Sequence, residues 1–302
     1  MNKQSAGISL SIAFVLLILT GCSTSQNVNP GIKSVFVSIL PQKYFVERIG
    51  GDVLNVHVMV GPGQSPHAFE PTPVQLTALA ESDIYFSIGI PFEDHLLKRL
   101  EGFQSEIELV NTCKGITLRK IASGRQCENE KHEHHDAEGD DPHTWLDPMI
   151  ALKQTQTMYD ALVNTYPEYM ESFAAAFDSL KTDLNALDSA LLRKLEPFNG
   201  SKLYVYHPAF GYFADRYGLV QTAVEIEGKE PTAKDIIGFL ETADNDKPGI
   251  IFVQPQFSSS SAERIAETIN AIVVPIDPMA YDYIENLMNI AGKISVGFNS
   301  DE

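Results

Sequence analysis

The stretch EYMESFAAAFDSLKTDLNALDSALLRKL, residues 168–195, decides the fold of this chain. Apolar side chains recur in it at spacings of four and three, which places them on one face of an α-helix. They are Phe173, Phe177, Leu180, Leu184, Leu187 and Leu191. Prolines bracket the stretch at positions 167 and 197, and at a rise of 1.5 Å per residue the helix is roughly 40 Å long. A helix of that length can join two lobes.

Short β-branched runs alternate with helical stretches on both sides of this helix. We expect strands at 35–40, 53–60, 84–88 and 107–110 before it, and at 203–206, 221–224, 250–253 and 272–276 after it. Candidate helices lie between them, at 73–81, 151–164, 232–242 and 260–270. Such alternation favours parallel sheets covered on both faces. The sequence therefore predicts an α/β fold of two lobes with mainly parallel sheets, joined by one long rigid helix.

The N-terminus has the pattern of an export signal. Residues 8–19 form an apolar run that is too short for a membrane span, and Leu19-Thr20-Gly21-Cys22 follows it. A small residue directly before a cysteine at this place is typical of bacterial lipoproteins, in which Cys22 becomes the acylated first residue. A plain signal peptide with a chance cysteine is the alternative. The polar residues 23–31 then resemble a flexible tether.

The net charge and the cysteine spacing exclude some classes of function and of metal site. The chain of 302 residues has 40 acidic against 22 basic side chains, a formal charge of −18, which disfavours binding to nucleic acid. In an oxidising compartment, Cys113 and Cys127 are expected to form a disulfide or to remain free thiols, and their spacing matches no zinc-knuckle pattern.

The expected organisation follows from these features. It is a signal peptide at 1–21, a tether at 22–32, an N-terminal α/β lobe at 33–167, the linking helix at 168–196 and a C-terminal α/β lobe at 197–302. Within the first lobe, residues 128–141 (ENEKHEHHDAEGDD) are nearly devoid of apolar side chains and predict a loop. Its histidines, His132, His134 and His135, are interpreted either as part of a solvated polar loop or as a weak auxiliary collector of metal.

Four side chains that can bind a metal share one sequence context, beside a proline and near the end of an expected strand or the start of a helix. His67 lies in SPHAFEP and His143 in DPHTWLDP, whereas His207 and Asp277 directly follow expected strands and precede prolines. Ligands in open parallel sheets bind beyond the carboxyl ends of the strands. Two residues come from each lobe, so all four are expected to converge in the cleft between the lobes. Three imidazoles and one carboxylate suit tetrahedral Zn²⁺.

Four stretches carry a resemblance to a known family. GQSPHAFEPTPVQLTALAESD, DPHTWLDP, YHPAFGYFADRYGL and PIDPMA resemble the signatures of zinc/manganese-type (ZnuA/TroA-like) solute-binding proteins of bacterial ABC importers, in order from about Val35 to Ile294. The resemblance implies two α/β lobes, a rigid connecting helix and one metal in the cleft. It also places His67, His143, His207 and Asp277 on the four ligand positions of the family.

The third ligand position divides the family. Manganese-preferring members resemble a site of two histidines and two carboxylates, whereas zinc members keep a third histidine, and this chain has His207 there. Imidazole suits zinc better than manganese, so Mn²⁺ is the less favoured ion. Some zinc members replace the aspartate with water or use a glutamate near the first histidine. The substitutes for Asp277 in this sequence are Glu70, Glu225 and Glu227.

The function expected from these patterns is capture of Zn²⁺ outside the cytoplasm and delivery to the membrane subunit of an ABC permease. A manganese-binding member of the same family and a surface adhesin-like lipoprotein with a bound metal are the alternatives. Three histidines with an open position also occur in zinc hydrolases, but no H-E-x-x-H or G-x-S-x-G motif is present, so we expect no enzyme. We expect a monomer held at a membrane by its lipid anchor, facing the periplasm or the cell exterior.

Overall fold

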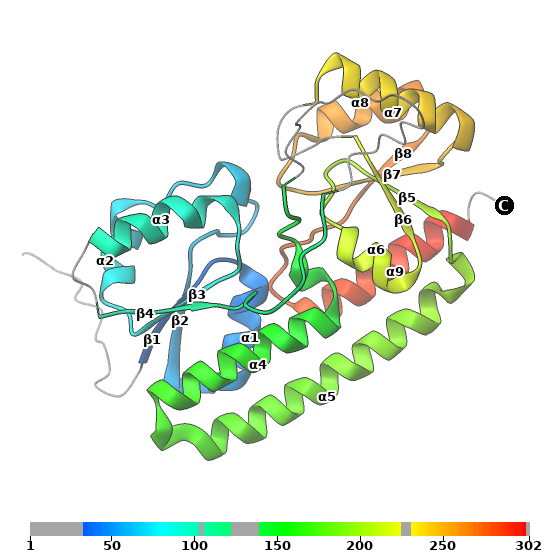
Figure 1. The fold of residues 1–302 in the computed structure, drawn as a ribbon. Helices are drawn as coiled ribbons and strands as arrows, with labels where there is room; N and C mark the ends of the chain where they lie inside the picture. Colours follow the sequence, from blue (N-terminus) through cyan, green and yellow to red (C-terminus); the bar gives the residue numbers. More distant parts are fainter. Residues whose placement is uncertain (1–32, 103–105, 122–138, 225–230, 300–302) are drawn as a thin grey trace, which may run out of the picture. The chain divides into compact units, whose positions relative to one another are not determined.

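Two four-stranded parallel sheets organise the computed structural model, which describes residues 33–102, 106–121, 139–224 and 231–299 (Figure 1). The first sheet has the order β2-β1-β3-β4 and the second β6-β5-β7-β8. Their strands are β1 (Lys33–Val37), β2 (Leu54–Val58), β3 (Ile84–Ser87), β4 (Glu108–Asn111), β5 (Lys202–Val205), β6 (Val220–Ala223), β7 (Ile250–Val253) and β8 (Ile272–Pro275). Every pairing between these strands is parallel.

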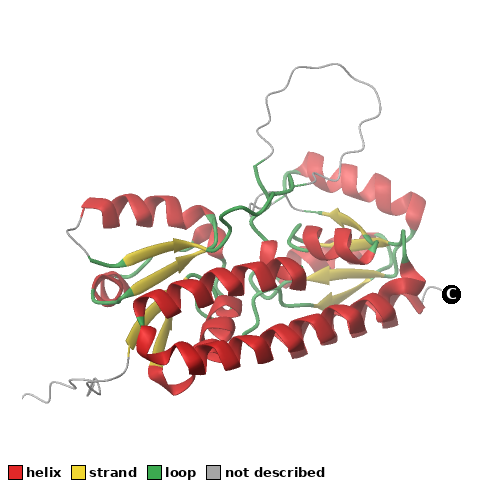
Figure 2. Cartoon of the chain, turned by 60° about the horizontal axis from the view of Figure 1, so that its bottom comes forward, coloured by secondary structure: helices red, strands yellow, loops and turns green. Residues whose placement is uncertain are grey.

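Helices connect the strands and cover both sheets, as the colouring of Figure 2 shows. They are α1 (Leu40–Gly50), α2 (Pro73–Ala80), α3 (Pro91–Gly102), α4 (Pro148–Thr165), α5 (Met170–Leu195), α6 (Gly211–Tyr217), α7 (Ala233–Asp246), α8 (Ser259–Thr268) and α9 (Tyr283–Asn299). Two short 3₁₀ helices, η2 (Pro66–Ala68) and η3 (Thr144–Leu146), precede α2 and α4. None of the helices in the described ranges is both long and apolar enough to cross a lipid bilayer.

Helix α5 runs past both sheets (Figure 1) and packs against α1, α4 and α9. Its apolar stripe is buried, with Leu180, Leu184 and Leu191 fully inaccessible to solvent. These side chains belong to one hydrophobic cluster that also holds Val35 of the first sheet and Val205 of the second. A smaller cluster lies where α7 and α8 cover the second sheet. Because both sheets share one core through α5, bending between them would disrupt tightly packed side chains.

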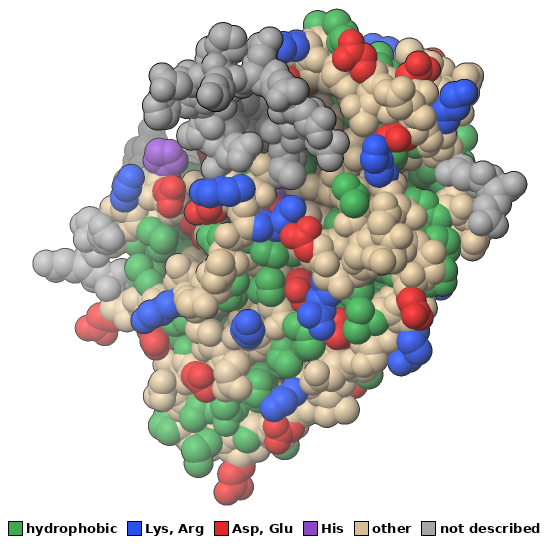
Figure 3. Space-filling view, turned by 45° about the vertical axis from the view of Figure 1, so that its right-hand side comes forward, with side chains coloured by type: hydrophobic (Ala, Val, Ile, Leu, Met, Phe, Trp, Pro, Cys, Tyr) green, Lys and Arg blue, Asp and Glu red, His purple; other side chains and the backbone are tan. Residues whose placement is uncertain are grey.

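The surface carries both signs of charge. On the face shown in Figure 3, acidic and basic side chains are interspersed with hydrophobic ones, so the acidic excess forms no single patch there.

The expected fold class is confirmed: two parallel sheets, covering helices and one long helix between them. The ends of several strands and helices differ by a few residues from those expected, for identifiable reasons. The first strand stops at Val37 because α1 begins at Leu40, where Pro41 in the first turn favours helix initiation. Helix α4 begins at Pro148, since Asp147 caps it by accepting a hydrogen bond of 2.7 Å from the Met149 amide.

The division into lobes at 33–167 and 197–302 stays a prediction. The signal peptide, the tether and most of the histidine-rich segment lie outside the described residues.

Candidate metal centre

Three histidines approach one point from separate parts of the chain. His67 lies in η2, beyond the end of β2, and His143 stands immediately before η3. His207 follows β5 after one residue, at the carboxyl edge of the second sheet. Pro66, Pro142 and Pro208 stand beside them, and each fixes the local backbone where an imidazole is held.

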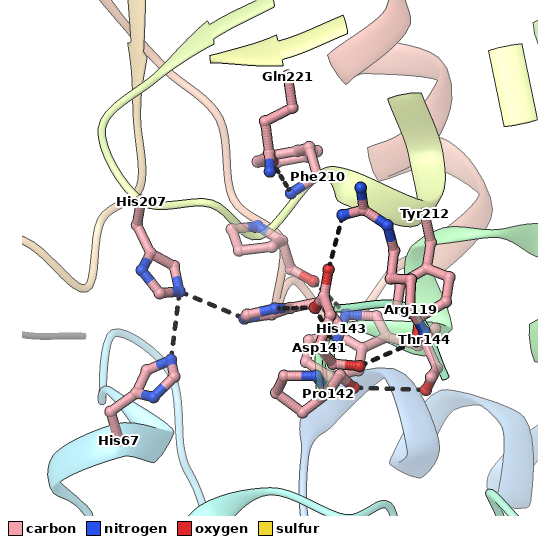
Figure 4. Close-up of polar contacts among 12 residues, drawn as sticks. His67, Arg119, Asp141, Pro142, His143, Thr144, His207, Phe210, Tyr212 and Gln221 are labelled. Carbon is pink, nitrogen blue, oxygen red and sulfur yellow. Dashed lines mark hydrogen bonds and ion pairs between the residues drawn. The ribbon is translucent and has the colours of Figure 1, made fainter. Parts of the chain in front are cut away.

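The spacing of the three rings suits a tetrahedral ion. His207 Nε2 lies 3.2 Å from His67 Nε2 and 3.3 Å from His143 Nε2 (Figure 4). In tetrahedral zinc with Zn–N bonds near 2.0–2.1 Å, two coordinating nitrogens are separated by about 3.3–3.4 Å. The ligand atoms of all three residues lie within 4.8 Å of one another, and no other such group occurs among the residues that the structure describes.

Burial keeps the imidazoles of His67 and His207 in the neutral form that binds metal. His143 and His207 are each only 3% exposed, and His67 is partly buried. Burial lowers the pKa of His67 to about 4, with a further decrease from His143 and an opposing increase from Asp141. Burial, assisted by His143 and His67, also lowers the pKa of His207 well below its ordinary value. Both rings are therefore ready to accept a cation at neutral pH.

Neighbouring side chains fix His207 and His143. The ring of Phe257 stacks on His207 with centroids 4.6 Å apart. The Gln254 side chain accepts a hydrogen bond of 3.2 Å from the amide of His207 and donates one of 2.9 Å to its carbonyl oxygen. On the other side, Asp141 accepts hydrogen bonds from the Nδ1 atom and the amide of His143. The imidazoles of His143 and His207 are thus oriented before any ion arrives.

Trp145, which belongs to the DPHTWLDP motif, supports the site from a distance, whereas Asp147 of the same motif caps α4. The fully buried Trp145 donates a hydrogen bond of 2.8 Å from Nε1 to the carbonyl oxygen of Pro278, next to Asp277. Tyr283 in turn donates from its hydroxyl to the carbonyl oxygen of Trp145. The segment that holds His143 is therefore fastened to the segment that follows β8.

Asp277, the expected fourth ligand, is not part of the three-histidine group. Its Oδ1 accepts hydrogen bonds of 2.9 Å from Gln256 Nε2 and from the amide of Met279. The carboxylate of Glu70, one of its possible substitutes, is exposed and also stands outside the group.

Several other expected site residues lie outside the described residues, and predictions on them are untested. They are Glu225, Glu227, His132, His134, His135, Cys22 and Cys127.

Within the described part of the chain Cys113 is a free thiol, and because Cys127 lies outside that part the expected disulfide stays a prediction. Its Sγ lies 3.1 Å from the carbonyl oxygen of Ile88 and 3.3 Å from Gln154 Nε2. Burial raises the pKa of this thiol, so it remains protonated at neutral pH.

Two residues beside His143 were missed by sequence reasoning. Asp141 stands two residues before His143 in the same motif, so its proximity was visible in the sequence, although its bond to the ring was not. Arg119, whose NH1 atom lies 3.0 Å from Asp141 Oδ2, has no recognisable signal, because 22 residues separate the pair.

Known proteins provide independent comparisons. The family model of the zinc-uptake complex component A, periplasmic (ZnuA), matches residues 35–296. The ZnuA protein of the high-affinity zinc uptake system of Bacillus subtilis is 27% identical over 288 residues, which cover 90% of this chain and 87% of that protein. A crystal structure of ZnuA is 34% identical with a TM-score of 0.79, covering 88% of this chain and 99% of the other. A zinc-bound deletion mutant of ZnuA has the same identity and TM-score, with coverage of 88% and 98%. Since the family model spans most of the sequence, the chain belongs to the ZnuA family.

Proposed function

We propose that this protein captures Zn²⁺ outside the cytoplasm and delivers it to an ABC-type permease. The observation that carries the proposal is the separation of 3.2–3.3 Å between the Nε2 atoms of His67, His143 and His207, which suits tetrahedral zinc. The ZnuA relative with zinc in its crystal structure has the same fold at 34% identity, which supports the same cargo here. Zinc is the transported substrate of such a protein, and its capture would exchange bound water for protein ligands without any covalent reaction.

The nature of the ligands favours zinc over manganese. Neutral imidazole is a preferred ligand of Zn²⁺, whereas Mn²⁺ favours carboxylate and water oxygens. The group in the described residues contains three imidazoles and no carboxylate. Asp277 remains the proposed fourth ligand, because it follows β8 and is fastened to the His143 segment through Pro278 and Trp145.

The remaining parts of the proposal concern the partner and the location. Members of this family are solute-binding proteins that work with ABC permeases. We assign the lipid anchor to Cys22 on the sequence pattern alone, and place the monomeric protein in the periplasm or at the cell exterior. Incorporation of labelled palmitate that disappears in Cys22→Ala would support the anchor, and equal labelling of both proteins would contradict it.

The test of the function is a competitive zinc titration of the purified protein, with manganese run in parallel. Wild type should bind one zinc equivalent tightly and manganese far more weakly. His207→Ala should abolish the tight equivalent, whereas His95→Ala, which changes an exposed histidine on α3, should leave it unchanged. Tight zinc that survives His207→Ala would overturn the proposed site, and tight manganese with weak zinc would overturn the proposed cargo.

A further inference from the structure

We propose that Asp141, held by Arg119, is a positioning residue that fixes the tautomer of His143 with Nε2 directed at the metal. The inference rests on the proposed function and adds to it a partly buried charged pair behind the metal-binding ring. Asp141 is 0% exposed, and its Oδ1 lies 2.8 Å from His143 Nδ1 and 3.0 Å from the amide of the same residue. The opposite nitrogen of that ring, Nε2, is the atom that lies 3.3 Å from His207 Nε2.

The direction of the hydrogen bond follows from the chemistry of the acceptor. A carboxylate without a proton only accepts hydrogen bonds, so Nδ1 of His143 must carry the proton of the neutral ring. The lone pair is then on Nε2, where a cation can bind. Figure 4 shows the three groups in this order, with Asp141 on one side of the ring and His207 on the other. Metal-binding histidines are commonly fixed in this way, and a carboxylate also makes the ring a stronger ligand.

Arg119 compensates the buried charge of Asp141. Its NH1 atom lies 3.0 Å from Asp141 Oδ2, the oxygen that His143 does not use. The same guanidinium lies over the ring of Tyr212 and pairs through Nε with Asp215 Oδ2 at 2.9 Å. A buried carboxylate without such a partner would be strongly destabilising.

A glycine on the second half of the chain leaves room for this pair. A Cβ atom at Gly211, the first residue of α6, would lie 1.5 Å from Arg119 NH1 and 2.7 Å from Asp141 Oδ2. Gly211 follows His207 by four residues. The helix that begins just after His207 therefore leaves space for Arg119 and Asp141, which support His143. The close approach is an observation independent of the hydrogen bonds, and any side chain at position 211 would displace the guanidinium.

Tyr212, the next residue of α6, ties the pair to the same helix. Its hydroxyl donates to the carbonyl oxygen of Asp141 at 2.9 Å and accepts from the amide of Arg119 at 3.0 Å. The amide of Asp141 also donates to the carbonyl oxygen of Arg119 at 2.8 Å. Backbone and side chains therefore hold Arg119 and Asp141 in one fixed arrangement against α6.

Two readouts test the proposal on the purified protein. The first is the long-range ¹H–¹⁵N NMR spectrum of the metal-free, ¹⁵N-histidine-labelled protein at pH 8, assigned with His143→Ala, which reports the tautomer without any zinc. Wild type should show His143 protonated at Nδ1, and Asp141→Asn should show a mixture of tautomers. The second is the zinc affinity, which should fall about 10- to 100-fold in Asp141→Asn.

Three further variants separate positioning from general loss of structure. Gly211→Ala should reproduce the mixed tautomer although it changes neither Asp141 nor His143. Arg119→Ala should weaken zinc binding, and Arg119→Lys, which keeps a cation, should recover part of the loss. His95→Ala, which changes an exposed histidine on α3 outside this network, should behave like wild type.

An unchanged His143 tautomer in Asp141→Asn, or unchanged zinc affinity in that variant, would overturn the inference. If Asp141→Asn fails to fold, Gly211→Ala and the two Arg119 variants test the inference through the same two measurements, the His143 tautomer and the zinc affinity. Failure of the proposed function has a different readout. It would be shown by tight zinc binding that survives His207→Ala, whereas the His143 tautomer is measured without any metal.

Discussion

The Nε2 atoms of His67 and His207 lie 3.2 Å apart, although 140 residues separate the two histidines in the sequence. Their ring centroids are 4.8 Å apart at an interplanar angle of 74°, so the rings meet edge to face with their nitrogens converging. Two neutral rings in this arrangement share at most one proton between the facing nitrogens, and a bound cation satisfies both lone pairs. The relationship therefore makes His67 as necessary to the site as His207.

Removal of the His67 imidazole should weaken zinc binding strongly. We expect His67→Ala to reduce the affinity by at least about 100-fold, which corresponds to about 3 kcal/mol of binding free energy, because one of three imidazole bonds is lost. Competitive titration with a chelator measures the change. His57→Ala is a matched control, since His57 is a half-buried histidine of β2 that stacks on Phe36 outside the group. Equal loss in both variants would mean that the effect is one of folding.

The stability of the metal-free protein should depend on pH through His67. Its pKa is about 4 in the folded protein, lowered chiefly by burial, against about 6.5 in the unfolded chain. As the pH falls from 6.5 to 4, His67 binds a proton in the unfolded chain but not in the folded protein. The free energy of unfolding therefore decreases over this range. The loss from this residue is about 3 kcal/mol.

Urea denaturation at pH 7 and pH 4.5 measures this loss. His67→Gln, which does not titrate there, should lose less unfolding free energy than wild type between the two pH values. Identical losses in the two proteins would show that His67 is not held neutral by the fold.

The sequence was sufficient for the fold because the relevant signals are local. Alternating β-branched runs and helical stretches predict parallel sheets, and the stripe from Phe173 to Leu191 predicts α5. The metal-binding roles of His67, His143 and His207 could also be predicted from the sequence, since each lies beside a proline at the end of an expected element. Local patterns could not predict how Asp141 and Arg119 are arranged around His143. The contact of Arg119 with Asp141 depends on the path of the chain between them and on the absence of a side chain at Gly211.

The histidine-rich segment should bind metal weakly and independently of the main site. Replacing His132, His134 and His135 together by alanine should remove additional weak zinc equivalents and leave the tight equivalent unchanged, because the sequence around them has almost no apolar side chains with which to pack a preformed site. Isothermal titration of the variant beside wild type distinguishes the two classes of site. A loss of the tight equivalent would instead assign these histidines to the main site.

Asp277→Asn tests the fourth ligand. The amide keeps an oxygen that can accept from the amide of Met279, so the fold of this turn should persist while the negative charge is lost. We expect zinc affinity to fall at least about tenfold, as a neutral amide oxygen is a much weaker zinc ligand than a carboxylate. Glu70→Gln should have no effect. If Glu70→Gln weakens binding and Asp277→Asn does not, the carboxylate near His67 is the fourth ligand.

The Trp145–Pro278 hydrogen bond should stabilise the protein and connect the two halves of the site. Trp145→Phe keeps an aromatic ring but leaves the carbonyl oxygen of Pro278 without its donor, in a place where the indole is fully buried. We expect a loss of about 1–3 kcal/mol of unfolding free energy, measured by urea denaturation of the metal-free protein. Leu192→Ala, which removes a side chain 43% exposed on α5, should cost less. Since Pro278 adjoins Asp277 and the Trp145 ring lies 5.3 Å from that of His143, Trp145→Phe should also weaken zinc binding, and unchanged affinity would contradict this connection.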